Sequence, residues 1–416
     1  MKTNKVAIEY LEKIASFLVL LMPISIAVGR GVADTNLSAV AVLFLVYLFL
    51  RRDFSFFKEG WVKASLLFWF YLIVNSLFRE NYLVGLSKTV PFIRFIFFAL
   101  CFQFVVARQG NLDKKLLVIL SVIVCFLVID GYIQYFWGRD IFGRQKIFDH
   151  MGNYQYYRLT GPFSKRVLGA VLMILSPVVL SFLLFKIKES PKKNMVLVLP
   201  IILIEVIIFL TGERAALIQS CFALAILFVY IYRSNINIFF LFGGTLCVLV
   251  SLYLVIPNDL LVRHWDSVRI LKMGSESAYG MLWKSSVLMG LDNPLFGVGG
   301  GNFQESCRGL VSFCNYHSHN VYLEMFSEFG LVGLVLFCAL LFFIFRDICL
   351  VLKMCRGRYN LVCVLAVGIG AAVFVKLLPF LPSSGFFKNW YAVPLWFMVG
   401  WMQHLKMISK SNSVNA

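Results

Sequence analysis

Long apolar runs recur along the whole chain of 416 residues, and they constrain its fold more than any other feature. A hydrocarbon core about 30 Å thick takes roughly 20 helical residues to cross. The runs are continuous rather than alternating apolar and polar, which favours spanning helices over membrane strands. Hydrophobic residues make up 60% of the chain and charged residues 14%, values that exclude a water-soluble globular domain. The sequence therefore predicts an all-α polytopic membrane protein.

The apolar runs divide into about twelve spans, and roughly ten to fourteen are compatible with the usual uncertainty of element boundaries. The expected spans cover residues 14–29, 37–50, 61–78, 90–106, 116–134, 167–185, 195–210, 215–232, 237–256, 321–345, 361–378 and 389–405. No soluble domain, linker, low-complexity tract or convincing internal repeat accompanies them. The sequence thus predicts one integral membrane domain over residues 1–416.

Basic residues set the expected orientation of these spans. They gather at alternate span ends, within residues 2–13, 51–63, 108–115, 186–193 and 346–358. Short loops rich in Lys and Arg stay in the cytoplasm. We therefore expect both termini in the cytoplasm and two loops, residues 135–166 and 257–320, on the outer, periplasmic side. A cleaved signal peptide is not expected, because no clear small-x-small site follows the first apolar run.

The two outer loops are themselves basic. The net charge of +18 partly reflects the inside bias of the short loops, but residues 135–166 and 257–320 also carry several Lys and Arg each. Long loops cross the membrane largely regardless of charge, so these residues do not contradict the orientation. Their density indicates that an anionic ligand is handled on the outer side.

The ten cysteines fall into two groups. Most lie in or beside spans, where a cysteine behaves as a small apolar side chain, and we expect them to be packing residues: Cys101, Cys125, Cys221, Cys247, Cys338, Cys349, Cys355 and Cys363. Cys307 and Cys314 lie in the long outer loop. In an oxidising compartment they form either a disulfide that stiffens the loop or two free thiols, and the sequence leaves both open.

The long outer loop has room for short helices. Residues 277–290, "SAYGMLWKSSVLMG", predict an amphipathic helix at the membrane surface. Residues 292–303, "DNPLFGVGGGNF", then break it, and their glycines are expected to let a ligand approach the main chain. No strand precedes this segment and no GK[ST] follows it, so a nucleotide site is not expected.

Arg214 ends a span in "LTGERAAL", at a depth where an ionisable residue needs a partner or a function. The structural interpretations are an ion pair with the neighbouring Glu213 or a side chain that snorkels to the interface. The functional interpretation is a guanidinium that faces an outward cavity, where its fork geometry suits two phosphate oxygens.

Arg158 lies in "YYRLTGPFSKRVLG", immediately before the sixth span. The tyrosines at 154, 156 and 157 form either an interfacial aromatic belt or flat faces for sugar rings. Lys165 and Arg166 follow and rank below Arg158, because they also suit simple helix-flanking positions.

His317 and His319 head the span at 321–345. They do not share a helical face, and no cysteine or carboxylate completes a convincing zinc set, so no metal is expected. Asn320 is expected to be the N-cap of the span, with His319 just ahead of the first turn, where the helix dipole disfavours imidazolium. A neutral imidazole there is a candidate general base, and the competing interpretation is a histidine that only anchors the interface.

Two carboxylates and two glycines follow the histidines in the same span. Glu324 and Glu328 share one helical face and are expected to orient an imidazole or to pair with an arginine. Gly330 and Gly333 are expected to allow close approach of a neighbouring helix.

Taken together, these motifs resemble the O-antigen ligase family, whose wider group includes O-antigen polymerases and O-linking oligosaccharyltransferases. "HNVYLEMFSEFGLVG" at 319–333 fits the family's His-Asn, nine residues, Gly-x-x-Gly pattern. "RLTGPF", "TGERAAL" and "NPLFGVGGGNF" look like the family's other landmarks in the expected order. The resemblance covers residues 150–345, and the remainder agrees only in its number of spans.

The resemblance implies a glycosyl transfer at the bacterial inner membrane, from an undecaprenyl-pyrophosphate-linked glycan to a hydroxyl of lipid A–core oligosaccharide. It implies no metal or other cofactor and no nucleic-acid partner. His319 would activate the acceptor hydroxyl, Arg158 and Arg214 would hold the pyrophosphate, and further substrate contacts are expected from His317, Asn320, Arg263 and Lys284. Relatives usually have an arginine near the position of Ala278 and Tyr279, so a third pyrophosphate contact stays open, with Arg263, Arg269 or Lys284 as substitutes.

The charges of the outer loops fit the chemistry that the resemblance implies. A departing pyrophosphate builds negative charge that fixed guanidinium groups can neutralise in place of a divalent ion. Attack from the side opposite the leaving group inverts the anomeric configuration in one step and needs no enzyme nucleophile. The alternatives are a polymerase or an O-linking oligosaccharyltransferase that uses the same donor, or a transporter of lipid-linked sugars. A transporter is disfavoured by the absence of clear paired repeats and by the clustering of charges at one face.

Overall fold

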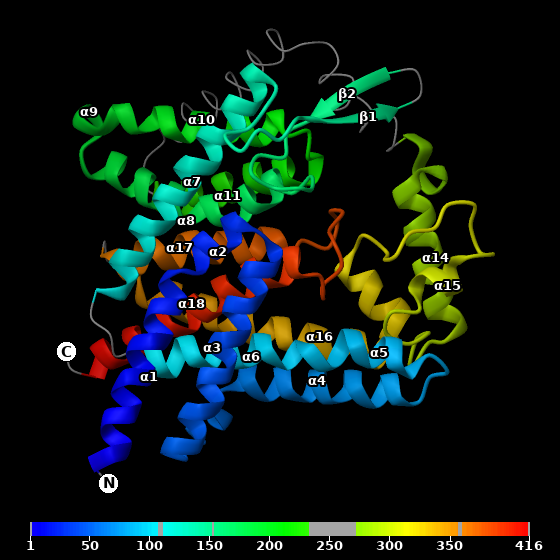
Figure 1. The fold of residues 1–416 in the computed structure, drawn as a ribbon, viewed down its shortest axis with the longest axis horizontal. Coiled ribbons are helices and arrows are strands. Elements are labelled where there is room, and N and C mark those ends of the chain that lie inside the picture. Colours follow the sequence, from blue (N-terminus) through cyan, green and yellow to red (C-terminus); the bar gives the residue numbers. More distant parts are fainter. Residues whose placement is uncertain (1, 107–110, 152–153, 233–271, 357–359, 415–416) are drawn as a thin grey trace.

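The computed structural model describes residues 2–106, 111–151, 154–232, 272–356 and 360–414, and these are mainly helical (Figure 1). The helices are α1 (Lys2–Leu20), α2 (Met22–Val28), α3 (Arg30–Arg51), α4 (Gly60–Leu77), α5 (Tyr82–Thr89), α6 (Ile93–Leu100), α7 (Leu112–Trp137), α8 (Leu168–Glu189), α9 (Pro191–Asn194), α10 (Val198–Leu210), α11 (Arg214–Ile231), α14 (Ala278–Asp292), α15 (Phe303–Cys307), α16 (Val321–Met354), α17 (Leu361–Lys376) and α18 (Asn389–Val414). The strands are β1 (Ile147–Met151) and β2 (Tyr154–Arg158). The all-α polytopic fold predicted from the sequence is confirmed.

Most of the expected spans coincide with helices. Within the described residues, 8 helices are long and apolar enough to cross a membrane, or up to 9 if the bent pair α1 and α2 is one span. The shorter apolar helix α17 and the more polar α18 occupy the last two expected spans. The expected span at 237–256 lies outside the described residues. The total of about twelve spans therefore stays a prediction.

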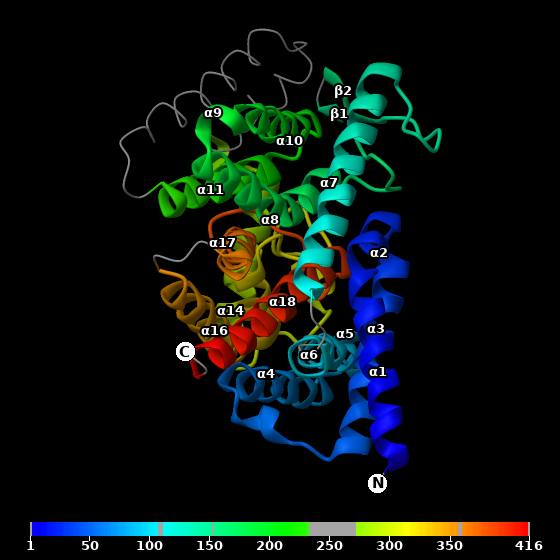
Figure 2. The ribbon, with the colours of Figure 1, turned by 90° about the vertical axis from the view of Figure 1, so that its left-hand side faces the viewer.

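Helix α8 lies at the centre of the bundle and packs against α7, α10, α11 and α17, while α1, α2 and α3 pack together along one flank (Figure 2). Small residues allow the closest of these approaches. A Cβ on Gly368 of α17 would stand only 2.6 Å from the Cα of Val178 in α8. At the same crossing Ser181 donates a hydrogen bond of 2.9 Å to the carbonyl oxygen of Val364. This pattern is typical of helices that pack in an apolar solvent.

Helix α16 is kinked at Gly330, whose φ of 69° and ψ of −168° are not helical. Backbone hydrogen bonds of 2.8–3.3 Å join residues 294–299 to residues 327–332 on both sides of the kink. A Cβ on Gly330 would stand 2.3 Å from the carbonyl carbon of Leu295, and one on Gly297 2.4 Å from that of Glu328. Both glycines are therefore required by backbone-to-backbone contact.

This contact corrects two expectations. The glycine-rich segment 292–303 does not line the cavity described below; it braces the kink of α16 instead. Gly330 likewise accommodates that segment and not a neighbouring helix. Helix α4 completes the brace, because Tyr71 donates to the carbonyl oxygen of Phe329 (2.6 Å) and Asn75 to that of Phe296 (2.8 Å). The kink leaves carbonyls without helical partners, and these side chains satisfy them.

A two-stranded antiparallel hairpin, β1–β2, interrupts the helical pattern after α7 and was not expected from the sequence. Its register places Ile147 opposite Arg158, at the end of β2. The segment that follows is held by Gln134 of α7, whose Oε1 accepts hydrogen bonds from the backbone N–H groups of Thr160 (2.8 Å) and Gly161 (3.0 Å). Gln134 is fully buried, so it fixes the direction that the chain takes after β2 ends at Arg158.

The predicted helix at 277–290 is present as α14, and the side chain of its N-cap Ser277 accepts a hydrogen bond from the N–H of Gly280. It packs against α16 through Gly290, where a Cβ would meet the ring of Phe326 at 2.2 Å. Its other contacts are with α15, through the buried Leu282 and Met289. One face of α14 is thus a packed wall, and its place relative to a membrane surface stays a prediction.

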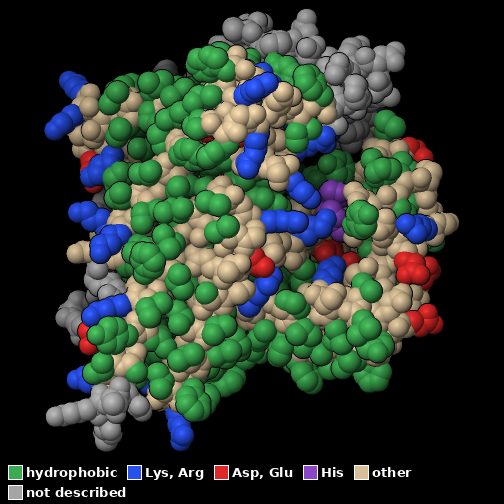
Figure 3. Space-filling view, viewed as in Figure 1, with side chains coloured by type: hydrophobic (Ala, Val, Ile, Leu, Met, Phe, Trp, Pro, Cys, Tyr) green, Lys and Arg blue, Asp and Glu red, His purple; other side chains and the backbone are tan. Residues whose placement is uncertain are grey.

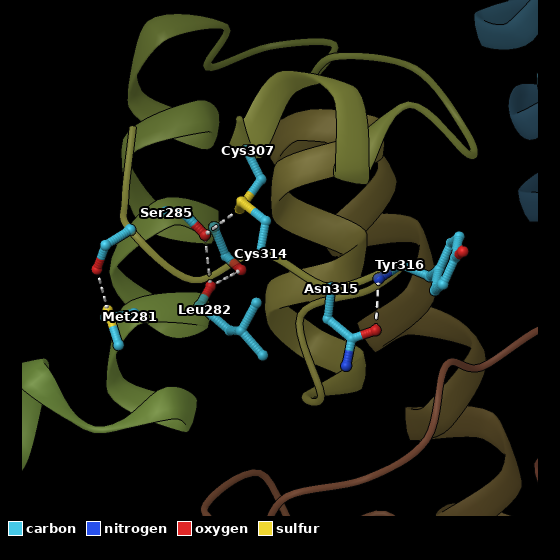
Figure 4. Close-up of a disulfide and its surroundings, with 9 residues drawn as sticks. Met281, Leu282, Ser285, Cys307, Cys314, Asn315 and Tyr316 are labelled. Carbon is cyan, nitrogen blue, oxygen red and sulfur yellow. Dashed lines mark hydrogen bonds between the residues drawn. A yellow bond between two sulfur atoms is a disulfide. The ribbon is translucent and has the colours of Figure 1, made fainter. Parts of the chain in front are cut away.

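Two disulfides join pairs of cysteines in the described residues. Cys307 and Cys314 are paired, which decides between the two states that the sequence left open (Figure 4). The bond lies against α14 beside Ser285, and Asn315 follows it directly. Cys355 and Cys363 are also paired and tie the end of α16 to the start of α17, whereas we expected them to be packing residues.

Candidate functional site

A cavity of about 1220 Å³ lies between the hairpin, α11, α14, the start of α16 and the loop before α18. Figure 3 shows the histidine side chains in this recess with Lys and Arg side chains beside them. The described residues that line it include one carboxylate, Glu213, and a set of cations. These cations are Arg158, Lys165, Arg166, Arg214, Lys284, Lys376 and Lys388. The cavity is therefore suited to a large anionic ligand.

Two sides of the cavity differ in chemistry. The histidine wall consists of His317, His319 and Lys388, which come from the turn before α16 and the loop before α18. The arginine wall consists of Arg158, Arg214 and Lys376, together with the carboxylate of Glu213. The structure thus brings Arg158, Arg214, Lys284, His317 and His319 to one cavity from elements far apart in sequence.

Asn320 is the N-cap of α16, as expected. Its Oδ1 accepts from the N–H groups of Tyr322 (3.0 Å) and Leu323 (3.2 Å), and its Nδ2 donates to the carbonyl oxygen of Pro379 (2.6 Å). The side chain is 5% exposed and does not line the cavity. The expectation that Asn320 binds substrate is therefore corrected: both ends of its amide are used to start the helix and to hold the following loop.

His319 adopts a φ of 55°, a left-handed conformation that histidine enters more readily than most residues. Its carbonyl oxygen accepts a hydrogen bond of 2.7 Å from the N–H of Ser383, which holds the turn in this conformation. The edge of the Tyr279 ring lies against the imidazole, with centroids 5.5 Å apart. Tyr279 therefore orients His319 from α14.

The imidazole of His319 is neutral with its Nε2 free of a proton. Nε2 lies 3.1 Å from Nδ2 of Asn315, whose Oδ1 already accepts from the N–H of Tyr316. The amide therefore donates to Nε2, and the ring proton belongs on Nδ1. Burial, and then the charge of Lys388, lower the pKa of His319 to about 4. Burial contributes more than the helix dipole invoked from the sequence, but the expected neutral state is the same.

The imidazole ring of His317 packs against that of His319, with ring centroids 4.0 Å apart. Its Nδ1 accepts from the ammonium of Lys388 at 3.0 Å, and its Nε2 is buried without a hydrogen-bond partner in the described part of the chain. Burial, His319, Lys388 and Lys88 together lower the pKa of His317 to about 2. Both imidazoles are therefore in their neutral form at neutral pH, with one ring nitrogen free of a proton.

Contrary to the expectation from the sequence, Glu324 and Glu328 contact neither an imidazole nor an arginine within the described residues. Both pair with Lys88 of α5, at 2.9 Å and 2.5 Å. Glu324 also accepts from the N–H of Phe386 (2.7 Å), and Glu328 from that of Gly301 (2.9 Å). A buried ion cluster is tolerated when its charges are paired, and here both carboxylates pair with one ammonium, although Oε1 of Glu328 has no hydrogen-bond partner in the described part of the chain. The cluster ties α5 and two loops to α16 behind the histidine wall.

Glu213 organises the arginine wall. Its carboxylate accepts hydrogen bonds from the N–H groups of Gly169 (3.0 Å) and Ala170 (3.2 Å) at the start of α8. Burial raises the pKa of Glu213, and the positive charges of Arg158 and Lys376, with the two N–H groups, oppose that shift. The carboxylate of Glu213 thus lies near two cations, Arg158 of β2 and Lys376 of α17. Glu213 is also the neighbour of Arg214 in sequence.

The remaining predicted site residues have different outcomes. Lys284 of α14 lines the cavity and is exposed. Arg263 and Arg269 lie outside the described residues. The described residues contain no group of three or more His, Cys, Asp or Glu that could hold a metal ion.

Sequence reasoning missed Lys376, Lys388 and Asn315. Lys376 closes an otherwise uncharged apolar helix, and an ionisable residue there is a signal that could have been used. Lys388 and Asn315 lie in loops outside any expected motif and carry no such signal.

The fold and the cavity define a polytopic membrane protein whose bundle holds a cationic cavity with two neutral histidines. Residues 195–338 match the family model described as O-Antigen ligase. The match confirms the family resemblance read from the motifs and supports an enzyme of ligase or polymerase type that acts on lipid-linked glycans. No curated protein matches the chain. The matched range includes Arg214 and both histidines, whereas Arg158 and Lys376 lie outside it.

Proposed function

We propose that this protein is an O-antigen ligase that transfers a polysaccharide from undecaprenyl pyrophosphate to a hydroxyl of lipid A–core oligosaccharide. The observation that carries the proposal is the single cavity that holds His319 with an unprotonated Nε2 and also holds Arg158 and Arg214. A proton acceptor and fixed cations are the two requirements for moving a sugar from a diphosphate to a hydroxyl.

The residues divide the reaction between the two walls. The acceptor hydroxyl takes the place of the Asn315 amide at Nε2 of His319 and gives its proton to that nitrogen. Its oxygen attacks the anomeric carbon as the bond from that carbon to the phosphate oxygen breaks, and the electron pair leaves with the diphosphate. Arg158 and Arg214 stabilise the leaving charge through their guanidinium forks. The single displacement inverts the anomeric configuration.

The same proposal places the protein in the bacterial inner membrane with both termini in the cytoplasm. In Figure 1, α1 begins and α18 ends at the left of the molecule, whereas α14 and α15 lie at the right. The cavity lies on the side of α14. This arrangement supports a periplasmic cavity that both a lipid-linked donor and a lipid-anchored acceptor can enter, and it agrees with the positive-inside pattern.

The test is reconstitution of the purified protein with a lipid-linked glycan and two acceptors, lipid A–core and a second lipid-linked glycan. Glycosylation of lipid A–core supports the ligase. Glycosylation of only the second lipid-linked glycan would replace it by a polymerase, which the family match equally allows. Chelator should leave the rate unchanged, and turnover that depends on a divalent ion would contradict the role given to the guanidinium groups.

A further inference from the structure

A buried ammonium group stands on the arginine wall and is not explained by the protein's own contacts. Lys376 is the last residue of α17, is only 6% exposed, and still lines the cavity. Its Nζ lies 4.5 Å from the centroid of the Tyr391 ring. Within the described residues its ammonium makes no hydrogen bond or ion pair. Its three N–H donors are therefore available to a ligand.

The surroundings hold the lysine in place without satisfying it. The end of a helix favours a positive charge, and the Tyr391 ring adds a cation–π contact. Tyr391 also donates a hydrogen bond of 2.9 Å to the carbonyl oxygen of Lys376, which fixes the backbone at this point. These two contributions are smaller than the cost of taking an ammonium out of water. An anion in the cavity would offset the difference.

Glu213 shows where that anion would bind. Lys376, Arg158 and Glu213 line the same cavity, and the charges of both cations act on the carboxylate. The carboxylate already accepts from two N–H groups of α8. Lys376 is not among its hydrogen-bond partners in the described residues, so the ammonium gains only a longer-range attraction from this carboxylate.

We propose that Lys376 is a third cation of the diphosphate site, donating from α17 to the same diphosphate as Arg158 and Arg214. This inference rests on the proposed function. A lipid-linked diphosphate diester carries two negative charges. When the bond between the anomeric carbon and the phosphate oxygen breaks, its electron pair stays on the diphosphate, which then carries three negative charges. The proton of the acceptor hydroxyl passes to His319. A third cation opposes the charge that appears in this step.

The experiment measures binding to the purified protein of undecaprenyl pyrophosphate and of undecaprenyl monophosphate, without glycan or acceptor. Lys376→Met removes the charge at nearly constant volume. We expect it to weaken binding of the diphosphate about tenfold or more and binding of the monophosphate much less. Lys376→Arg, which keeps the charge, should retain most of the affinity for the diphosphate. Lys186→Met is the matched control, because it removes a lysine from the far, exposed end of α8.

The preference for the diphosphate separates a ligand contact from a structural role, since a loosened fold would weaken both lipids alike. Unchanged affinity for the diphosphate in a Lys376→Met protein with the wild-type melting temperature would overturn the proposal. Should that variant not fold, Lys376→Gln carries the same expectation. Lysine-dependent binding by a protein that glycosylates neither acceptor would contradict the proposed function and leave the diphosphate site standing.

Discussion

The two walls of the cavity differ in how far charge survives burial. On the histidine wall, burial removes charge: both imidazoles have pKa values far below the usual range for histidine and are neutral. On the arginine wall, the carboxylate of Glu213 attracts the guanidinium group of Arg158 and the ammonium of Lys376, and this attraction opposes the effect of burial. One ligand would therefore meet a proton acceptor on one side and fixed positive charge on the other.

The walls are also held differently. The histidine wall is held through the backbone around the start of α16, by its N-cap and by the kink that residues 294–299 brace, with the ion cluster that Lys88 of α5 forms behind it. The arginine wall is assembled from β2, α11 and α17, which meet only in the folded protein. A single substitution should therefore disturb the first wall through its backbone and the second through its charge.

The largest effect is expected from His319→Ala. Loss of a general base reduces the rate by about 10²- to 10⁴-fold, because the acceptor hydroxyl keeps its proton. Binding of undecaprenyl pyrophosphate should remain close to wild type, since the arginine wall is intact. Transfer to lipid A–core and binding of the donor lipid are measured on the same preparation. Full transfer activity in the variant would remove His319 from the mechanism.

The next effect is expected from Gly330→Ala, which tests how the histidine wall is held. The new Cβ would stand 2.3 Å from the backbone of Leu295, so the brace must separate from the kink. We expect a melting temperature several degrees lower and weaker transfer. Gly309→Ala is the matched control, because Gly309 also has a positive φ, of 95°, and nothing within 4 Å of an added Cβ. Equal losses in both variants would show that backbone strain alone, not the brace, causes the effect.

The sequence predicted the parts of this molecule that local pattern decides. The apolar runs place the helices because each must satisfy its backbone within the membrane, and Asn320 marks the start of α16 because an amide accepts from the first free N–H groups. It did not predict which glycines face a ligand. Gly297 and Gly299 look like a ligand cradle in sequence, yet their neighbours are Glu328 and Arg79. Whether a glycine admits a ligand or another segment of backbone depends on contacts between distant residues.

The site shows the same division. Arg158, Arg214 and the two histidines were found because each stands in a recognisable motif. Lys376 and Lys388 follow the matched family range and come to the cavity only through the packing of α17 and of the loop before α18. Glu324 and Glu328 have the spacing of a functional pair, but their partner, Lys88, is more than 200 residues away in sequence. Long-range charge pairing is not visible in a local pattern.

A smaller effect is expected from Arg214→Lys on the arginine wall. The charge stays, but the planar fork that binds two phosphate oxygens is lost. One charge-assisted hydrogen bond contributes about 1.5–3 kcal/mol, so transfer should fall about tenfold to a hundredfold. Lys284→Arg serves as the comparison, because it adds a fork at an exposed position of the same cavity. An unchanged rate for Arg214→Lys in the purified assay would mean that Arg214 is structural.

The smallest effect is expected from Lys388→Met, which should shift the pH dependence of transfer. The substitution tests how the histidine wall is kept neutral. The Lys388 ammonium repels a proton on His319, whereas the Glu324 carboxylate attracts one, and burial dominates both. Removing the ammonium therefore makes protonation easier and raises the pKa of His319 above about 4. Transfer requires the unprotonated ring, so the acid limb of kcat/KM should move to higher pH, while the rate at neutral pH changes little. Lys165→Met is the control, because it removes another cation that lines the same cavity. An acid limb at the wild-type position in Lys388→Met would show that the histidine wall is kept neutral by burial alone.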